Sequence, residues 1–213
     1  MAQPHYLVLI GDLVRSRTAE DRAGLQRQLS QCLDSLNTAA PDTLVSPYTL
    51  TLGDEFQAVR SGLDGLWPEL LRIQATLLPM RVRFSLGVGA LATPINKKQA
   101  LGMDGAAFYA ARAGIERLKD NDRQWAIGGL KEADQRWATA LLDAIDSLTR
   151  KWRANRFEIL YRLLSEQSPG TIAADLDLSV QAVYRNIRDG DLELIMELLQ
   201  LVDSLLYQAL NRT

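Results

Sequence analysis

Residues 50–59 read LTLGDEFQAV, and this stretch decides how the first part of the chain folds. Apolar and polar side chains alternate around Gly53, which is the pattern of two short strands. Glycine tolerates the positive φ angles of a tight turn, so Gly53 is expected at the tip of a hairpin. The stretch therefore predicts a hairpin that presents the carboxylates of Asp54 and Glu55 at the edge of an apolar sheet.

A further acidic residue ends a strand upstream. Residues 6–10, YLVLI, form a continuous apolar run that is typical of a buried strand, and Gly11 and Asp12 follow it. If this strand and the hairpin are neighbours, Asp12 and Asp54 meet at one edge of the sheet. Two carboxylates that approach each other are unfavourable unless a cation or a proton relieves their repulsion. We therefore expect Asp12 and Asp54 to form a shared site.

The composition is that of a globular protein, with 213 residues, 47% hydrophobic and 23% charged. A formal net charge of -2 gives no overall basic surface, so contact with nucleic acid needs a local patch. One cysteine and one histidine exclude an intrachain disulfide, a cysteine-based zinc cluster and a multi-histidine metal site. The sequence shows neither a signal-peptide pattern nor a run of about 18 apolar residues, so we expect a cytoplasmic protein without a membrane-spanning segment.

Hydrophobic spacing divides residues 1–129 into alternating strands and helices. Their order predicts an α+β domain of ferredoxin-like type, with helices covering one face of the sheet. Gly87 and Gly89 leave one side of a predicted strand open to close approach by another group. The predicted strands cover 6–10, 49–52, 55–59, 81–89 and 123–127, with helices over 18–36, 63–78 and 104–118 and a loop over 37–47.

Strand patterns stop after Leu130, so residues 130–213 are predicted to form an all-α domain. Short helices are expected over 157–166, 170–176 and 180–188. In a last helix, over 192–210, apolar residues cover more than one face, which predicts burial on two sides or a dimer seam. A long helix before them is expected to bury one face, which is made of Trp137, Leu141, Ile145, Leu148 and Trp152.

Residues 171–188, TIAADLDLSVQAVYRNIR, resemble the helix-turn-helix of bacterial regulators. Ser179 is expected to cap the second helix. This second helix would then contact DNA bases or phosphates through Gln181, Tyr184, Arg185 and Arg188. In the alternative interpretation the two helices serve only packing or dimerisation.

The first part of the chain resembles a family of nucleotide enzymes. Three blocks, IGDLV (10–14), LGDEF (52–56) and RFSLGVG (83–89) followed by GAAFYAAR (105–112), occur in the order found in class III nucleotidyl cyclases and diguanylate cyclases. Their combination is more similar still to the SatD family of bacterial proteins. The likeness covers residues 5–120 and implies a nucleotidyl-cyclase-like fold.

The resemblance also implies roles for individual residues. Asp12, Asp54 and the carbonyl of Leu13 would be the ligands of Mg²⁺ or Mn²⁺ over the phosphates of a nucleotide. Glu55 would act as a general base or an additional ligand. Arg112 would stabilise charge on the phosphates.

Two positions depart from the cyclase pattern. Phe108 stands where the cyclases have an asparagine, and Leu50 lies near the place of their base-selecting lysine. Since the loss of one oriented donor costs about two to three orders of magnitude in rate, the sequence leaves open whether the protein is an enzyme.

Arg15 and Arg17 could add charge-assisted contacts to a phosphate.

These patterns together predict a cytoplasmic regulatory homodimer of SatD type. Its cyclase-like domain would bind a nucleotide or another phosphate with divalent metal, and its helix-turn-helix would bind DNA. Two alternatives are an active nucleotidyl cyclase or related phosphoryl-transfer enzyme, and a non-catalytic dimeric scaffold.

Overall fold

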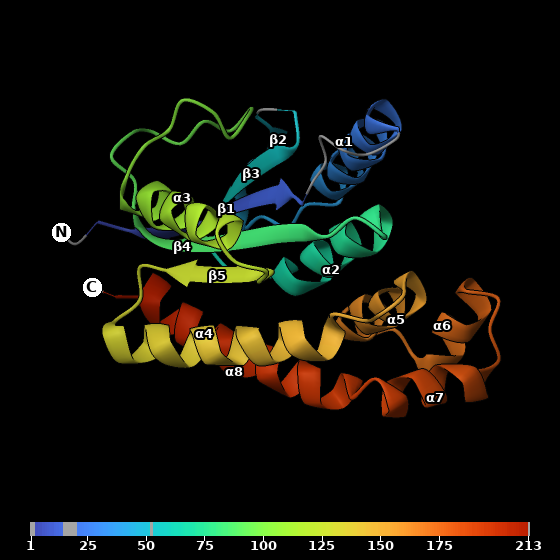
Figure 1. Cartoon of the computed structure of the whole chain (residues 1–213). Helices are drawn as coiled ribbons and strands as arrows, with labels where there is room; N and C mark the ends of the chain where they lie inside the picture. Colours follow the sequence, from blue (N-terminus) through green and yellow to red (C-terminus); the bar gives the residue numbers. More distant parts are fainter. Residues whose placement is uncertain (1–2, 15–20, 52, 213) are drawn as a thin grey trace.

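The structure is a computed structural model that describes residues 3–14, 21–51 and 53–212. Its strands form one sheet with helices on both sides (Figure 1). Arg15 and Arg17, the predicted additional phosphate contacts, lie outside the described residues. The elements in chain order are β1 (His5–Leu13), α1 (Arg22–Thr38), β2 (Leu44–Leu50), β3 (Glu55–Arg60), α2 (Leu66–Leu77), β4 (Val82–Ala90), α3 (Ala106–Lys119), β5 (Trp125–Gly128), α4 (Glu132–Thr149), α5 (Ala154–Leu164), α6 (Pro169–Asp175), α7 (Val180–Asp189) and α8 (Leu192–Leu210).

The sheet has the strand order β2-β3-β1-β4-β5. The central strand β1 pairs antiparallel with both β3 and β4, whereas β5 is parallel to β4. The apolar run of β1 explains its central place, because Leu7, Val8, Leu9 and Ile10 are all buried and consecutive side chains point to opposite faces. The predicted mixed α+β architecture is confirmed.

Helices cover both faces of the sheet, and the expectation of a single covered face is wrong. On one face Val8, Ile10 and Val59 pack against α3. On the other, Leu7 and Leu9 belong to a larger buried cluster that includes side chains of α1, α2, α4, α5 and α8. Figure 1 shows α3 on the side of the sheet opposite to α4 and α8. The second face needs a cover because β1 is apolar on both sides.

The backbone of α3 lies directly against the glycines of β4. A Cβ atom at Gly87 would lie 2.2 Å from the carbonyl oxygen of Ala107 and 2.4 Å from the amide nitrogen of Ala111. At Gly89 it would lie 2.9 Å from the amide nitrogen of Ala107. The close approach predicted at these glycines is therefore made by a helix of the same chain.

The predicted loop over 37–47 overlaps a strand, because β2 begins at Leu44. This edge strand contains Pro47, which has no amide hydrogen to donate. Its pairing with β3 shifts register between Leu44 and Ser46 and again between Ser46 and Thr49, so the proline falls in an irregular part of the ladder. An edge strand tolerates this, and the two prolines of the segment masked the strand in the sequence.

The C-terminal helices pack onto the sheet rather than apart from it. One buried cluster continues from the strands into α4, α5 and α8. The indole Nε1 of Trp67 on α2 donates a hydrogen bond to Oδ1 of Asp203 on α8, at 2.7 Å. Nδ1 of His5 lies 2.9 Å from the carbonyl oxygen of Ala209. The predicted parts 1–129 and 130–213 therefore share a core. Among the described helices, none is both long and apolar enough to cross a membrane.

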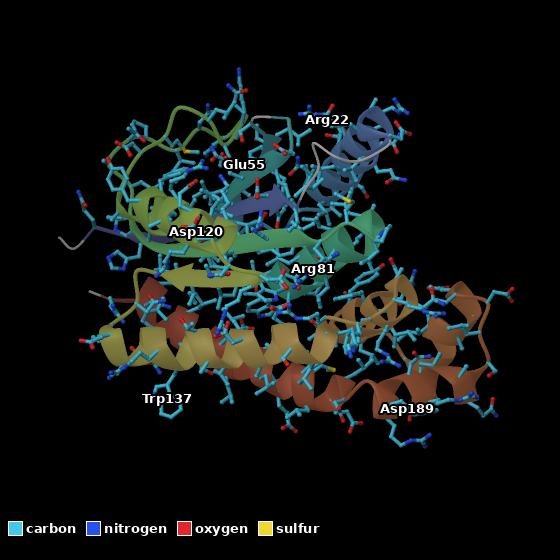
Figure 2. All side chains as sticks on the ribbon, viewed as in Figure 1. Arg22, Glu55, Arg81, Asp120, Trp137 and Asp189 are labelled. Carbon is cyan, nitrogen blue, oxygen red and sulfur yellow. The ribbon has the colours of Figure 1, made fainter. Side chains whose placement is uncertain are left out.

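The buried face of α4 differs from the predicted one. Ala138, Leu142 and Ile145 are buried, whereas Trp137 is 67% exposed and Leu148 is 36% exposed. Figure 2 shows Trp137 pointing away from the body of the protein. Two series of apolar residues with helical spacing overlap on this helix. The series with the smaller side chains, which contains Ala138 and Leu142, packs against α8.

Only part of the apolar surface of α8 is buried within the chain. Ile195, Leu199 and Val202 are buried, but Leu194 and Leu201 are 46% and 53% exposed. The predicted burial of this helix on two sides is therefore not reached within one copy of the chain. A dimer seam on the exposed face stays a prediction.

The contact between α3 and β4 yields a stability prediction. Gly87→Ala should lower the free energy of unfolding by about 3 kcal/mol, because the new methyl group meets helix backbone that can yield only by moving α3. Gly170→Ala is the matched control, since its Cβ would find only the Ser168 hydroxyl, at 3.8 Å. It should change stability by less than about 1 kcal/mol. Urea unfolding followed by circular dichroism measures both, and equal stabilities of the two variants would contradict this packing.

Candidate functional site

Three charged side chains meet at one end of the central strands. The hydrogen-bond register pairs Asp12 of β1 with Glu55 of β3 and with Arg83 of β4. Directly paired residues of neighbouring strands point to the same face, which here is the face covered by α3. The amide of Leu13 donates a hydrogen bond to the carbonyl oxygen of Asp54, at 3.1 Å. The predicted hairpin therefore brings Asp54 beside the end of β1.

Two arginines form ion pairs with the carboxylates of this cluster. Nη1 of Arg83 lies 3.0 Å from Oδ2 of Asp12. Arg112 of α3 binds Glu55 through both nitrogens, with Nη1 2.6 Å from Oε2 and Nη2 2.8 Å from Oε1. Such a fork-to-fork pair fixes orientation as well as charge. The carboxylates are buried, whereas the Arg112 side chain is 44% exposed and open to a ligand from solvent.

Charge and burial act together on Asp12. Burial raises the pKa of the Asp12 carboxyl, the hydrogen bond from Arg83 and the charge of Lys119 lower it, and the charge of Asp54 raises it. The hydrogen bonds to Glu55 raise the pKa of the Arg112 guanidinium. The charge of Asp54 is thus close enough to act on the Asp12 carboxyl.

A dense metal cluster is absent from the described part of the chain, where no three His, Cys, Asp or Glu side chains are grouped to hold an ion. Glu55 is engaged by Arg112 and Asp12 by Arg83, and Asp54 lies beside Asp12 at the same edge. Two carboxylates fit the way in which Mg²⁺ binds at phosphate sites, where one or two protein carboxylates share the ion with the phosphates.

Sequence reasoning missed two basic residues of this cluster and one beside the hairpin tip. Arg83 and Lys119 both act on Asp12, and the Nη2 atom of Arg22 lies 3.2 Å from the place of a Cβ atom on Gly53. The alternation of apolar and polar residues over 81–89 already places Arg83 on the polar face of this strand. That alternation was a signal by which the sequence could have identified Arg83. Lys119 comes from the far end of α3, and no local pattern links it to Asp12.

The second predicted site consists of α6 and α7. A turn of four residues, 176–179, joins the two helices, and Asp177 in it has a left-handed backbone with φ 52°. The hydroxyl of Ser179 accepts a hydrogen bond from the amide of Ala182 and caps α7, as predicted. Ile172 and Val183 are buried between the helices. The outer side of α7 exposes the predicted contact residues Gln181, Tyr184, Arg185 and Arg188.

Comparison with known proteins places this chain in a family. The family model of the SatD family matches residues 6–192. The chain belongs to the SatD family. The match extends beyond the likeness seen in the sequence, which covered residues 5–120, and includes α4 to α7. No curated protein matches the chain.

Solved structures similar to this SatD family member include two bacterial light-regulated adenylyl cyclases. The first is 14% identical with a TM-score of 0.41, and the match covers 60% of this chain and 77% of that one. The second is 15% identical with a TM-score of 0.40, and the match covers 59% of this chain and 43% of that one. This SatD chain therefore spans less than half of the second cyclase. At these scores the likeness carries no functional assignment.

The Glu55–Arg112 pair is expected to stabilise this SatD family member. Arg112→Ala leaves a buried carboxylate without its cation, which should lower the free energy of unfolding by about 2 kcal/mol. Arg117→Ala removes the same charge from an exposed position on the same helix and should cost less than about 0.5 kcal/mol. Urea denaturation checks both variants. In a Glu55→Gln background the cost of Arg112→Ala should shrink, and an unchanged cost would show that the pair does not couple β3 to α3.

Proposed function

We propose that this SatD family member is a cytoplasmic DNA-binding regulator and that α6 and α7 form its helix-turn-helix. The exposed side of α7 is the observation that carries the proposal. A capped helix that follows a four-residue turn is the geometry in which a recognition helix enters the major groove. Its exposed amide, phenol and guanidinium groups are the ones that bind base edges and phosphates.

The surroundings of α7 support this assignment. Arg156 of α5 lies against the helix, with its Nε 3.5 Å from Oδ1 of Asn186, and adds a positive charge close to it. Arg188 pairs with Asp189 at 3.2 Å, but both side chains are at least half exposed, so solvent screens the pair and DNA phosphate can replace it. The patch is only locally basic, which predicts modest affinity and strong dependence on salt.

DNA binding by the full chain tests the proposal. A labelled 30-base-pair duplex of random sequence should bind at low salt and dissociate as salt rises, as measured by fluorescence anisotropy. Arg185→Ala should weaken binding several-fold and reduce the slope of log affinity against log salt by about 1, because one phosphate contact is lost. Arg136→Ala removes another exposed arginine, on α4, and should leave binding unchanged. Equal effects of the two substitutions, or no binding at low salt, would refute a DNA-reading α7.

The sheet edge favours a second function, the binding of a phosphate-bearing ligand such as a nucleotide. The strand order β2-β3-β1-β4 supports the ferredoxin-like, cyclase-like arrangement that the sequence predicts. The half-exposed guanidinium of Arg112 supplies a donor fork for phosphate. Asp12 and Asp54, with the carbonyl of Leu13, would hold Mg²⁺ or Mn²⁺, which neutralises phosphate charge when bound.

Binding without turnover is the function proposed for this edge. Phe108, which stands in place of the cyclase asparagine, packs against the apolar cluster under α3 and offers no hydrogen-bond donor. The proposal includes a homodimer, since exposed Trp137 of α4 and Leu194 and Leu201 of α8 supply apolar surface that a second copy could bury. Ligand at the sheet edge would then bias the spacing of two α7 helices.

Thermal unfolding with ATP, GTP or pyrophosphate, each with MgCl₂ or with EDTA, tests the ligand site. A bound ligand at 100 times its Kd should stabilise the protein by about 2.7 kcal/mol. Asp54→Asn should abolish the part of the shift that depends on MgCl₂, because one of two metal-binding carboxylates is lost. Asp120→Asn, which removes an exposed acid at the end of α3, is the control (Figure 2). A shift that survives Asp54→Asn, or no shift with any of the three compounds, would contradict the site.

A further inference from the structure

One side of α8 carries leucines that the described part of the chain covers only in part. Leu194 and Leu201 are 46% and 53% exposed, and Leu198 and Leu205 are partly buried. These four leucines follow one another at intervals of four, three and four residues. Alternating intervals of three and four place side chains in one line along a helix, which is the arrangement of a coiled-coil seam. We call these four residues the leucine stripe.

The same spacing adds one polar residue at each end of the leucine stripe. Asp191 comes three residues before Leu194, and Gln208 comes three residues after Leu205. Both polar residues are exposed, and the side chain of Asp191 does not cap α8. The line therefore begins with a carboxylate, continues with four leucines and ends with an amide.

This order of side chains is complementary to itself when two α8 helices run antiparallel. A two-fold axis between Leu198 and Leu201 places Leu194 against the partner's Leu205 and Asp191 against the partner's Gln208. Leucine then packs on leucine along the middle, and at both ends an amide can donate a hydrogen bond to a carboxylate. A parallel pair would instead place Asp191 against the partner's Asp191, and like charges in an interface are unfavourable.

The charges beside the leucine stripe favour the same direction. Glu197 is exposed next to the stripe, in the first half of α8, whereas the corresponding position in the second half is the uncharged Ser204. The antiparallel pair brings Glu197 near the partner's Ser204. A parallel pair would add a further carboxylate from each copy to the end at which the Asp191 side chains meet.

We propose that a second copy of this chain covers the leucine stripe and that the two α8 helices pack antiparallel. The proposal rests on the homodimer proposed above and specifies its interface. A second copy is the occupant because the line of side chains matches itself, with apolar surface facing apolar surface and a donor facing an acceptor at both ends.

Antiparallel pairing sets the place of the two α7 helices. α7 directly precedes α8 and lies beyond its N-terminal end, so the two copies carry α7 at opposite ends of the dimer (Figure 1). The middle of α7 lies about 15 residues before the two-fold axis, which at about 1.5 Å per residue separates the two α7 helices by at most roughly 50 Å. Two half-sites one turn of DNA apart, at about 34–36 Å, lie within this reach.

Light scattering during size-exclusion chromatography tests the interface on the full chain over a range of micromolar concentrations. The unaltered chain should elute with twice the mass of one copy. Leu201→Gln and Leu194→Gln should each weaken dimerisation about tenfold or more, because a buried leucine contact is lost from both copies. Tyr207→Gln is the matched control, since Tyr207 is 64% exposed on the same helix but about 120° around it from Leu201. It should leave the dimer unchanged, and circular dichroism checks that each variant is folded.

Disulfide formation tests the direction of the two helices. In a Cys32→Ala background, a chain with Leu194→Cys mixed with a chain with Leu205→Cys should form a disulfide between them. Either variant by itself should not, because antiparallel pairing separates two copies of residue 194 by about 16 Å, and a disulfide needs Cα atoms within about 7 Å.

The outcomes separate this interface from the functions on which it depends. A monomeric unaltered chain would overturn the homodimer together with the interface. A dimer that resists both glutamine substitutions, equal effects of Leu201→Gln and Tyr207→Gln, or a disulfide in each cysteine variant by itself would overturn the antiparallel α8 interface alone. None of these measurements involves DNA or nucleotide, so they leave the proposed functions of α7 and of the sheet edge untouched.

Discussion

The burial of β1 on both faces is the constraint on which the rest of the structure depends. A strand with four consecutive apolar side chains cannot lie at the surface, so it needs a neighbour on each side and a helical layer above and below. The neighbours are β3 and β4, which both pair antiparallel with β1, and this register places Asp12 between Glu55 and Arg83. The α3 layer follows as well, and it carries Arg112 to Glu55. The charged cluster is thus a consequence of how an apolar strand is covered.

The Glu55–Arg112 ion pair joins β3 to α3 and also leaves a guanidinium exposed to solvent. Glu55 is buried and needs a cation, and the guanidinium that serves it remains 44% exposed. A phosphate that reaches Arg112 would compete with Glu55 for the same fork of donors or add to it. Because the pair joins β3 to α3, a ligand at this edge acts on the contact between a strand and the helix that covers it. This is a physical route by which binding could change the packing of the sheet.

The C-terminal helices share the core of the sheet, which changes how the two proposed binding functions relate. A separate helical domain on a flexible linker would respond to the sheet only through an interface that can slide. Here a continuous apolar cluster and the Trp67–Asp203 hydrogen bond tie α8 to α2, and α5 packs against α2 as well. Such a close-packed core has low compressibility and transmits strain. The position of α7 is therefore set by the same packing that holds the sheet, because α5 and α8 both contact it.

The sequence by itself determined where most helices and strands lie along the chain and which strand ends meet at the sheet edge. The alternation around Gly53 and the apolar run 6–10 predicted the hairpin and the strand that place Asp54 beside Asp12, and the helix periods predicted α1, α2, α3 and α5 to α8 within a few residues. These signals are local, because periodicity reports only which residues of one element share a face. Tertiary structure alone decided the cover of the second sheet face, the stripe of α4 that is buried and the arrival of Lys119 near Asp12. It also brought Trp67 of α2 to Asp203 of α8, 136 residues further along the chain. Such choices depend on which apolar surfaces fit together at close packing, and that fit is a property of whole elements in contact rather than of any one stretch of sequence.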